Sequence, residues 1–493
     1  MEVESAHRAA YERLGGTTSD PAFRCLGWTT TGDAVELHYE LEGLPALVER
    51  VRFPGHDLSG PLPPATAGAL DVLHLAAATS YYKAAIPRRV VLPDTLPAGV
   101  AMLEALLTHG LAEFGATNDL DLTGWPRIGV GEQQIVAGQA DVHGEPSVRL
   151  TGTDHAAVAD AATRPEPTDP PAGGSEDGER PAGVVVPVGG GKDSAVTAML
   201  AVANGWDAVA FAVNPRASME RTAAATGLPL RAAHRELDPR LLAWNDAGAL
   251  NGHVPITAIV ASIACVAATL EGRGDVLMSN EASADEPTRT VDGRVINHQY
   301  SKSSAFETLH RSAMQELVGD ATRAISVLRP LPELLVAAVF THLGAPLAAV
   351  NSCNRAYSLT RARVEWCGEC PKCLFVQLML APFTDPQHFQ DATGFDALAR
   401  ADLVERFAEL RDPVSKPYEC VGTVEEVQLA FDLLAATPRW RDHAAVAAHG
   451  DAETGPDHRL RVMIDAVDTS ALPNRYGRAI DRELAALREG RTP

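Results

Sequence analysis

Apolar and polar residues alternate along residues 34–53 in the first part of the chain. Because successive side chains of a strand point to opposite faces, this alternation predicts two strands, which we expect to pair as an antiparallel hairpin. Apolar residues at helical spacing predict helices over residues 66–83 and 100–114. Residues 1–15 suit a short amphipathic helix or a frayed end. Together these elements predict an α+β module over residues 1–153.

From residue 184 onward, short apolar runs alternate with helical segments. Buried strands are predicted at four of these runs, namely residues 184–186, 207–213, 229–234 and 275–278. Residues 256–270 are apolar all round, which predicts a buried helix. Strands that alternate with helices indicate an α/β fold with a doubly wound parallel sheet. Ligands of such sheets bind beyond the carboxyl ends of the strands.

Helical patterns continue through the second half of the chain. Residues 307–318 and 374–382 have the spacing of helices, and residues 328–350 are predicted to hold a further helix and a short strand. A helix is also predicted over residues 424–436. Residues 386–493 are therefore expected to form a helical C-terminal region.

One stretch shows no apolar periodicity. Residues 154–183 are acidic and rich in Pro, Gly and Ala, which predicts a flexible linker. The linker separates the N-terminal module from a domain that we place at residues 184–385.

The composition narrows the class of protein. The chain has 493 residues, 46% of them hydrophobic, and a net charge of −22. An acidic chain is a poor partner for nucleic acid, because binding to the phosphate backbone needs a basic face. The sequence shows no signal peptide and no apolar run of the ~18 residues that a membrane span needs. Its seven cysteines are odd in number and mostly clustered, so we expect a cytoplasmic enzyme rather than a secreted disulfide framework. The oligomeric state stays open.

The stretch around residues 184–194 carries the strongest chemical signal. A strand of three valines is followed by Gly189, Gly190 and Gly191, and a helix follows the glycines. Glycines let the backbone approach a ligand closely, and the first turn of a helix offers free N–H groups to an anion. The spacing is neither that of a Walker loop nor that of a dinucleotide fingerprint. An ordinary strand-to-helix turn is the alternative, but three glycines before Lys-Asp-Ser favour a phosphate site.

This loop resembles the Ser-Gly-Gly-x-Asp-Ser loop of the PP-loop ATP pyrophosphatases, with Gly189 in place of the first Ser. The resemblance implies a HUP-like fold and the splitting of ATP into AMP and pyrophosphate to adenylate a substrate. The three glycine amides and Ser194 would then hold phosphates, Lys192 would neutralise charge, and Asp193 would hold Mg²⁺ directly or through water. Asn214, at the end of the next strand, is a further candidate for the nucleotide.

Four cysteines have the spacing of a metal site. Cys353 lies upstream of Cys367, Cys370 and Cys373, which form a Cys-x2-Cys-x2-Cys run. Four thiolates match a tetrahedral structural Zn²⁺ site, and an iron–sulfur cluster that uses the same ligands is the alternative. Unconnected buried thiols are a poor explanation at this density. The PP-loop 7-cyano-7-deazaguanine synthases carry a similar cluster with a shorter first gap.

Candidates for proton transfer lie mainly in one polar run. Residues 297–303 include His298, Tyr300 and Lys302, and seven consecutive polar residues are unusual for a plain surface loop. His253 lies in a Gly- and Pro-containing segment. Cys420 is separate from the other cysteines and is either a small buried residue or an acid/base group.

Six stretches together resemble the UDP-N-acetylmuramoyl-L-alanyl-L-glutamate epimerase family (MurL). They are residues 187–194, 251–255, 279–283, 297–303, 366–373 and 416–423. The resemblance covers roughly residues 184–426 and extends loosely to Ser80-Tyr81-Tyr82-Lys83. Ala282 stands where the family usually has Arg.

The resemblance implies an enzyme that uses ATP and Mg²⁺ to invert the terminal L-Glu of a UDP-muramoyl dipeptide to D-Glu for peptidoglycan. The N-terminal module would bind the UDP-sugar end. Adenylation removes the charge of the carboxylate, so a modest base can take the neighbouring α-proton. His253, His298, Tyr300, Lys302 and Cys420 are the candidates for that transfer. Alternatives are another adenylating PP-loop enzyme, acting on a deazaguanine or a tRNA, and a nucleotide sensor without turnover.

Overall fold

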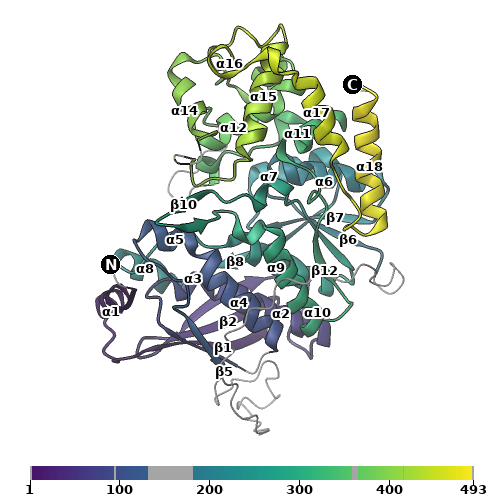
Figure 1. Ribbon diagram of the computed structural model, residues 1–493. Helices are drawn as coiled ribbons and strands as arrows, with labels where there is room; N and C mark the ends of the chain where they lie inside the picture. Colours follow the sequence, from purple (N-terminus) through teal and green to yellow (C-terminus); the bar gives the residue numbers. More distant parts are fainter. Residues whose placement is uncertain are drawn as a thin grey trace.

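The computed structural model describes residues 3–93, 96–130, 181–357, 365–412, 414 and 416–490. Its helices surround a sheet of ten strands in the order β12-β9-β6-β7-β8-β3-β2-β1-β4-β5 (Figure 1). The predicted linker lies, up to residue 180, outside the described residues. The α/β class and the helical C-terminal region are confirmed.

Five strands form the parallel half of the sheet. They are β6 (Val184–Pro187), β7 (Ala208–Val213), β8 (Leu230–Glu236), β9 (Asp275–Met278) and β12 (Arg323–Ser326). The first strand of this half in the chain, β6, lies between β7 and β9. The connections after β6 and β9 therefore lead to opposite sides of the sheet, which creates a crevice at their carboxyl ends. The glycine loop leaves β6 at this crevice.

The short strand predicted within residues 328–350 is wrong. The apolar run there is the buried helix α11 (Glu333–His342), and the strand, β12, lies before it. Arg323 begins β12 and pairs with Asp275 of β9 at 3.0 Å. This partner lets a strand begin with a charged residue, which the apolar pattern alone did not reveal.

The predicted hairpin is confirmed as β2 (Ala34–Leu41) and β3 (Leu47–Arg52). Sequence patterns missed three strands beside it, namely β1 (Ala22–Thr31), β4 (Arg89–Leu92) and β5 (Arg127–Val130). The hairpin joins the parallel half through β3, which pairs antiparallel with β8. At this seam Arg235 forms a double hydrogen bond with buried Glu49, at 2.7 and 2.8 Å. Strands from both sides of the predicted linker thus form one sheet.

Helices of the N-terminal and central segments cover the sheet. They are α1 (Val3–Arg13), α2 (Pro64–Ala77), α3 (Thr79–Tyr82), α4 (Pro97–Ala105), α5 (Ala112–Thr117), α8 (Pro239–Asp246), α9 (Ile256–Leu270) and α10 (Ser304–Leu317). Figure 1 shows α2, α4, α9 and α10 beside one another, and these helices pack together. The helix predicted over residues 100–114 is divided into α4 and α5 by a π-helical turn at Leu106–Gly110. After this turn, α5 places Glu113 in contact with His298.

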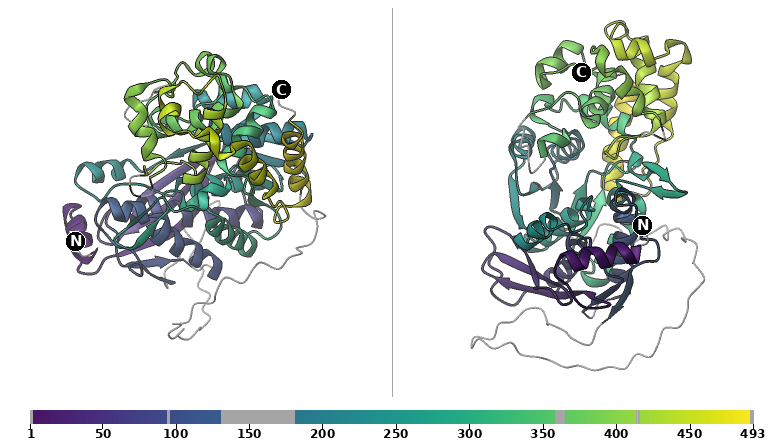
Figure 2. Two further views of the ribbon diagram at one scale, coloured as in Figure 1. Left: turned by 45° about the horizontal axis from the view of Figure 1, so that its top comes forward. Right: turned by 90° about the vertical axis from the view of Figure 1, so that its left-hand side faces the viewer.

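The C-terminal helices build a second core at the other end of the molecule (Figure 2). They are α12 (Pro371–Leu380), α13 (Pro386–Thr393), α14 (Val404–Glu409), α15 (Val424–Ala436), α16 (Ala444–His449), α17 (Pro456–Asp465) and α18 (Asn474–Arg488). Residues of α6 (Lys192–Ala203) and α11 join this core beside the sheet, and α7 (Ala217–Thr226) packs on α6. The last helix returns to the sheet, where Arg475 and the Tyr476 hydroxyl each bind Asp275 at 2.7 Å. Among the described helices, none combines the length and apolar character that crossing a bilayer requires.

Candidate active site

The glycine loop after β6 has the geometry of a ligand cradle. Gly190 has φ +84°, in the left-handed region that favours glycine, and its carbonyl accepts a hydrogen bond from the Asn351 amide at 2.7 Å. A Cβ at Gly191 would lie 2.8 Å from the Ser352 hydroxyl oxygen, which would have to move to make room. A Cβ at Gly189 would meet no atom within 4 Å. The loop thus needs glycine at Gly190, is tight at Gly191 and has space at Gly189.

A buried ion pair lies at the start of α6. Lys192 is 0% exposed, and its ammonium pairs with the carboxylates of Asp193 and Glu333. Burial alone would lower the pKa of Lys192, but the two carboxylates raise it above its ordinary value. Lys192 is therefore a permanent internal cation that ties the glycine loop to α11.

Three carboxylates gather beside this lysine. One oxygen from each of Asp193, Glu281 and Glu333 lies within 4.8 Å of the others. Burial and the charge of Glu333 raise the pKa of Glu281 to about 7. Glu281 follows β9, so the group lies at the crevice between β6 and β9 that the topology creates. Carboxylate oxygens are the ligands that Mg²⁺ prefers, and this set fits such an ion.

A thiol lies close to these charges. Cys420, before α15, accepts a hydrogen bond from Lys302, with Nζ and Sγ 3.3 Å apart. The Lys372 ammonium donates to the backbone carbonyl of Cys420. Burial raises the pKa of the Cys420 thiol, but the charges of Lys302, His298 and Lys372 outweigh burial and lower it to about 6. At neutral pH the group is a thiolate, the reactive form of cysteine.

Two histidines extend the cluster toward the N-terminal part of the chain. His298 hydrogen bonds through Nδ1 to Glu113 of α5, and its ring centroid lies 4.6 Å from that of His253. Burial would lower the pKa of His298, but its hydrogen bonds to Cys420 and Glu113 raise it to about 9. For His253, burial and the charge of His298 lower the pKa to about 4. One imidazole is thus charged at neutral pH and the other is neutral.

The structure brings together four of the five residues predicted for proton transfer, and Tyr300 lies apart from them. Its ring packs 5.2 Å from that of His109 and lines a hollow of about 400 Å³. Burial raises the pKa of Tyr300 to about 12. None of the other four candidates lines this hollow. Tyr300 therefore has no contact with the thiol among the described interactions.

Asn214 has a structural role at the position where the sequence suggested a nucleotide contact. Its side chain accepts from the Arg235 amide at 2.8 Å and donates to the Arg235 carbonyl at 2.9 Å. These two bonds extend the pairing of β7 with β8 by one residue. Contact between Asn214 and a nucleotide stays a prediction.

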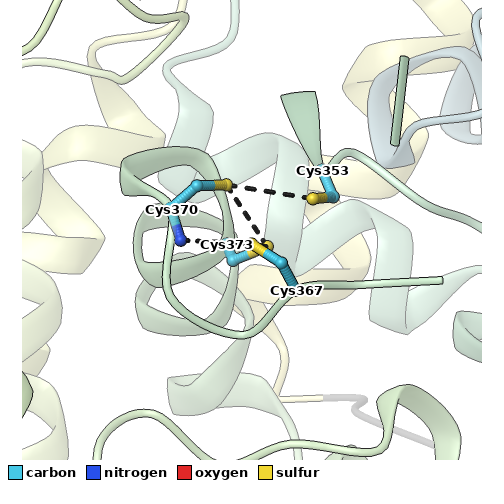
Figure 3. A group of neighbouring side chains, drawn as sticks. All are labelled: Cys353, Cys367, Cys370 and Cys373. Carbon is cyan, nitrogen blue, oxygen red and sulfur yellow. Dashed lines mark hydrogen bonds between the residues drawn. The ribbon is translucent and has the colours of Figure 1, made fainter. Parts of the chain in front are cut away.

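The four predicted metal ligands converge on one point (Figure 3). Distances between sulfur atoms are 3.9 Å for Cys353 and Cys370, 3.7 Å for Cys367 and Cys373, and 3.5 Å for Cys370 and Cys373. All four thiols are free, and all four sulfur atoms lie within 4.8 Å of one another. Four ligands at the usual Zn–S length stand about 3.8 Å apart at the corners of a tetrahedron. The cluster therefore has the dimensions of a site for a single metal ion.

Two protein-family models match the parts of the chain that supply the residues of this site. The MurL N-terminal domain matches residues 21–159 and 147–327, and the MurL C-terminal domain matches residues 349–459. The chain belongs to the MurL family. The resemblance found in the six sequence stretches is therefore confirmed.

Three relatives of this MurL-family chain carry the name UDP-N-acetyl-alpha-D-muramoyl-L-alanyl-L-glutamate epimerase. The protein from Salinispora tropica is 40% identical over 385 residues, which are 78% of this chain and 76% of the relative. That from a Micromonospora species is 39% identical over 385 residues, 78% of each chain. That from Xanthomonas oryzae pv. oryzae is 34% identical over 432 residues, 86% of this chain and 87% of the relative.

Sequence analysis of this MurL-family chain missed four charged residues of the cluster, namely Glu113, Glu281, Glu333 and Lys372. Glu281 and Lys372 lie inside stretches that carried the resemblance, so their presence there was the available signal. Glu113 and Glu333 lie in ordinary helices and gave none. Near Ala282, Arg329 donates to the Glu281 carbonyl at 2.9 Å. A guanidinium is thus present beside the position where the family usually has Arg.

Proposed function

We propose that this protein inverts the terminal L-Glu of UDP-MurNAc-L-Ala-L-Glu to D-Glu after adenylating the carboxylate next to the inverted carbon. The names of its relatives support the substrate and the inversion. The observation that carries the proposal is the position of the Cys420 thiol, whose sulfur lies 3.3 Å from the Lys302 ammonium, near the charges of Glu281 and Asp193. A base and an anion cradle in one crevice are what adenylation followed by proton abstraction requires.

Adenylation is assigned to the loop side of the crevice. The amides of Gly189, Gly190 and Gly191 and the hydroxyl of Ser194 would bind the phosphates of ATP at the start of α6. Asp193, Glu281 and Glu333 would hold Mg²⁺, which neutralises phosphate charge when bound. A carboxylate oxygen of the substrate attacks the α-phosphorus, the bond to the β-phosphate oxygen breaks, and pyrophosphate leaves with the electron pair.

Proton transfer is assigned to the thiol side. In the acyl-adenylate the substrate carboxylate no longer carries charge, so its carbonyl can accept electrons from the α-carbon. The Cys420 thiolate takes the α-proton, and the electron pair moves to the carbonyl oxygen. Protonation of the opposite face inverts the centre, and His298 and Lys302 are the charged acids nearby. Water then releases D-Glu and AMP, which makes the inversion irreversible.

The cysteine cluster is proposed to hold one structural Zn²⁺ rather than an iron–sulfur cluster. In an iron–sulfur cluster of four irons each thiolate binds a different iron, which spreads the sulfur atoms apart. Here the four sulfur atoms all lie within 4.8 Å of one another. The ion would fix the start of α12, on which two of the ligands stand.

The deciding experiment follows three products in one reaction. The protein is incubated with ATP, Mg²⁺ and UDP-MurNAc-L-Ala-L-Glu, and AMP, pyrophosphate and the chirality of the terminal glutamate are measured over time. D-Glu that appears together with AMP supports the proposal. AMP without inversion would point to another adenylating enzyme, and ATP binding with no release of product would point to a nucleotide sensor. Inversion without ATP would remove the adenylation step.

A further inference from the structure

Lysine is rare in this protein, and most of its lysine side chains are buried. The chain has five lysines among 42 Lys and Arg. Lys83, Lys192, Lys372 and Lys416 are only 5%, 0%, 6% and 3% exposed, and Lys302 is partly buried. Lysine normally keeps its ammonium in water, and burial requires a partner or a function. The exposed side chains among the Lys and Arg residues are therefore arginines, and each lysine stands where a compact ammonium lies wholly or partly inside the fold.

Three of these lysines surround the proposed reaction site. Lys192 is sealed between two carboxylates. The ammonium of Lys302 donates to Gln299 at 3.2 Å and to the Cys420 thiol at 3.3 Å. The third, Lys372, did not feature among the expected site residues, because it lies within the cysteine run.

Lys372 connects the two sides of the crevice. Its ammonium donates to the carbonyl of Cys420 and lies 3.5 Å from a carboxylate oxygen of Glu333, the partner of Lys192. The same ammonium lies 5.2 Å from the centre of the Phe375 ring. Within the described part of the chain it donates one hydrogen bond, although an ammonium has three N–H donors. A second N–H faces the Glu333 carboxylate, so among the described residues one donor remains for a ligand at the boundary between the glycine loop and the thiol.

The backbone of Lys372 is fixed on both sides. Cys370 precedes it by two residues and Cys373 follows directly, so two proposed metal ligands flank it on the first turn of α12. Its amide donates to the Glu419 carboxylate at 3.0 Å, which ties the turn to the loop of Cys420. A metal bound to the cysteines therefore holds this lysine in place.

We propose that Lys372 is a catalytic residue for adenylation, which binds the α-phosphate, and that the cysteine centre positions it. The proposal rests on the proposed function and deepens it. As the carboxylate oxygen bonds to the α-phosphorus and the bond to pyrophosphate breaks, negative charge gathers on the α-phosphoryl oxygens. An ammonium with an N–H group available to these oxygens stabilises that charge where water is excluded.

The test separates adenylation from proton transfer. Substrate-dependent exchange of labelled pyrophosphate into ATP reports adenylation, and exchange of the glutamate α-proton with deuterated water reports the later step. We expect Lys372→Met to lower pyrophosphate exchange about 100-fold or more, by analogy with the loss of one preorganised donor. Cys420→Ser should keep pyrophosphate exchange and lose α-proton exchange. Zinc content and melting temperature should stay at the wild-type values in both variants.

Two further variants make the result decisive. Arg459→Met is the matched control. Arg459 is also a cation paired with a buried carboxylate, because its guanidinium lies 2.7 Å from Asp432, and both residues are distant from Lys372 in the sequence. This variant should keep full pyrophosphate exchange. Lys372→Gln keeps a hydrogen-bond donor for the Cys420 carbonyl but removes the positive charge. If Lys372→Met does not fold, this variant tests the role of the charge instead. Wild-type exchange in folded Lys372→Gln would show that Lys372 only neutralises Glu333 and would overturn the proposal. A wild-type protein without substrate-dependent exchange would instead remove the proposed function.

Discussion

Lys302 and Cys420 are 118 residues apart in the chain, yet the lysine ammonium lies 3.3 Å from the cysteine sulfur. The pair converts an ordinary buried thiol, whose pKa burial would raise, into one with a pKa lowered to about 6. Cys265, which is buried without such a cation, has a raised pKa instead. The contrast between these two cysteines shows that the charge of the neighbour, rather than burial, determines the chemistry of Cys420.

Replacement of the thiol should stop inversion and leave adenylation intact. We expect Cys420→Ser to lower the rate of D-Glu formation by about 10²–10⁴-fold, because a serine hydroxyl is not deprotonated near neutral pH. AMP formation should persist through hydrolysis of the acyl-adenylate. Both products are measured in the same reaction, with Cys265→Ser as the control. Equal rates of inversion in wild type and Cys420→Ser would assign the base to another residue.

The rate of inversion should follow the ionisation of Cys420. Since the pKa of this thiol is about 6, the base is lost as the pH falls below that value and is fully present above it. Lys302→Met removes the nearest charge, so the acidic limb should move to higher pH. The same shift should appear in the rate of alkylation of Cys420 by iodoacetamide, read by peptide mass spectrometry. An unshifted alkylation profile in Lys302→Met would contradict the role of the lysine.

Glu113 should act through His298 as a positioning residue. Its carboxylate and the thiol hold the pKa of His298 at about 9, so the imidazole stays charged below that pH and loses its proton above it. In Glu113→Gln we expect the alkaline limb of the inversion rate to move to lower pH, while pyrophosphate exchange is unchanged. Glu104→Gln, an exposed glutamate on α4, is the control. Loss of pyrophosphate exchange in Glu113→Gln would indicate a broader structural role.

Two glycines of the same loop should respond differently to substitution. Gly190→Ala places a side chain on a backbone with φ +84°, where an L residue is strained, so we expect a loss of about 1–2 kcal/mol in the free energy of unfolding and weaker ATP binding. In Gly189→Ala the new Cβ meets no atom within 4 Å, so the free energy of unfolding and the affinity for ATP should stay nearly unchanged. Urea unfolding and calorimetric titration with ATP measure the two effects. Equal effects at both positions would rule out the steric explanation.

Removal of the metal should disable adenylation before it unfolds the whole chain. Cys367→Ser removes one of four ligands, and we expect loss of bound zinc, a lower melting temperature and loss of pyrophosphate exchange, because Lys372 is no longer fixed. Zinc is measured by mass spectrometry of the purified protein. Cys25→Ser, outside the cluster, should keep its zinc. Full exchange in zinc-free protein would separate the cysteine centre from catalysis.

Local patterns in the sequence were sufficient for the features that adjacent residues encode. Residues 184–194 predicted a strand, a glycine turn and a helix, because each element follows from spacing and residue type alone. The Cys-x2-Cys-x2-Cys run predicted a metal site, because three of its ligands lie within seven residues. The hairpin of β2 and β3 followed from alternation.

Contacts between distant segments were decided by the tertiary structure alone. The joining of β3 to β8 depends on the buried pair of Glu49 and Arg235, 186 residues apart, which no local pattern contains. Glu113 reaches His298 across 185 residues, and Glu333 reaches Lys192 across 141. The sequence could name His298 and Cys420 as able to move a proton. Only folding, which surrounds them with charges, raised the pKa of His298 and lowered the pKa of Cys420.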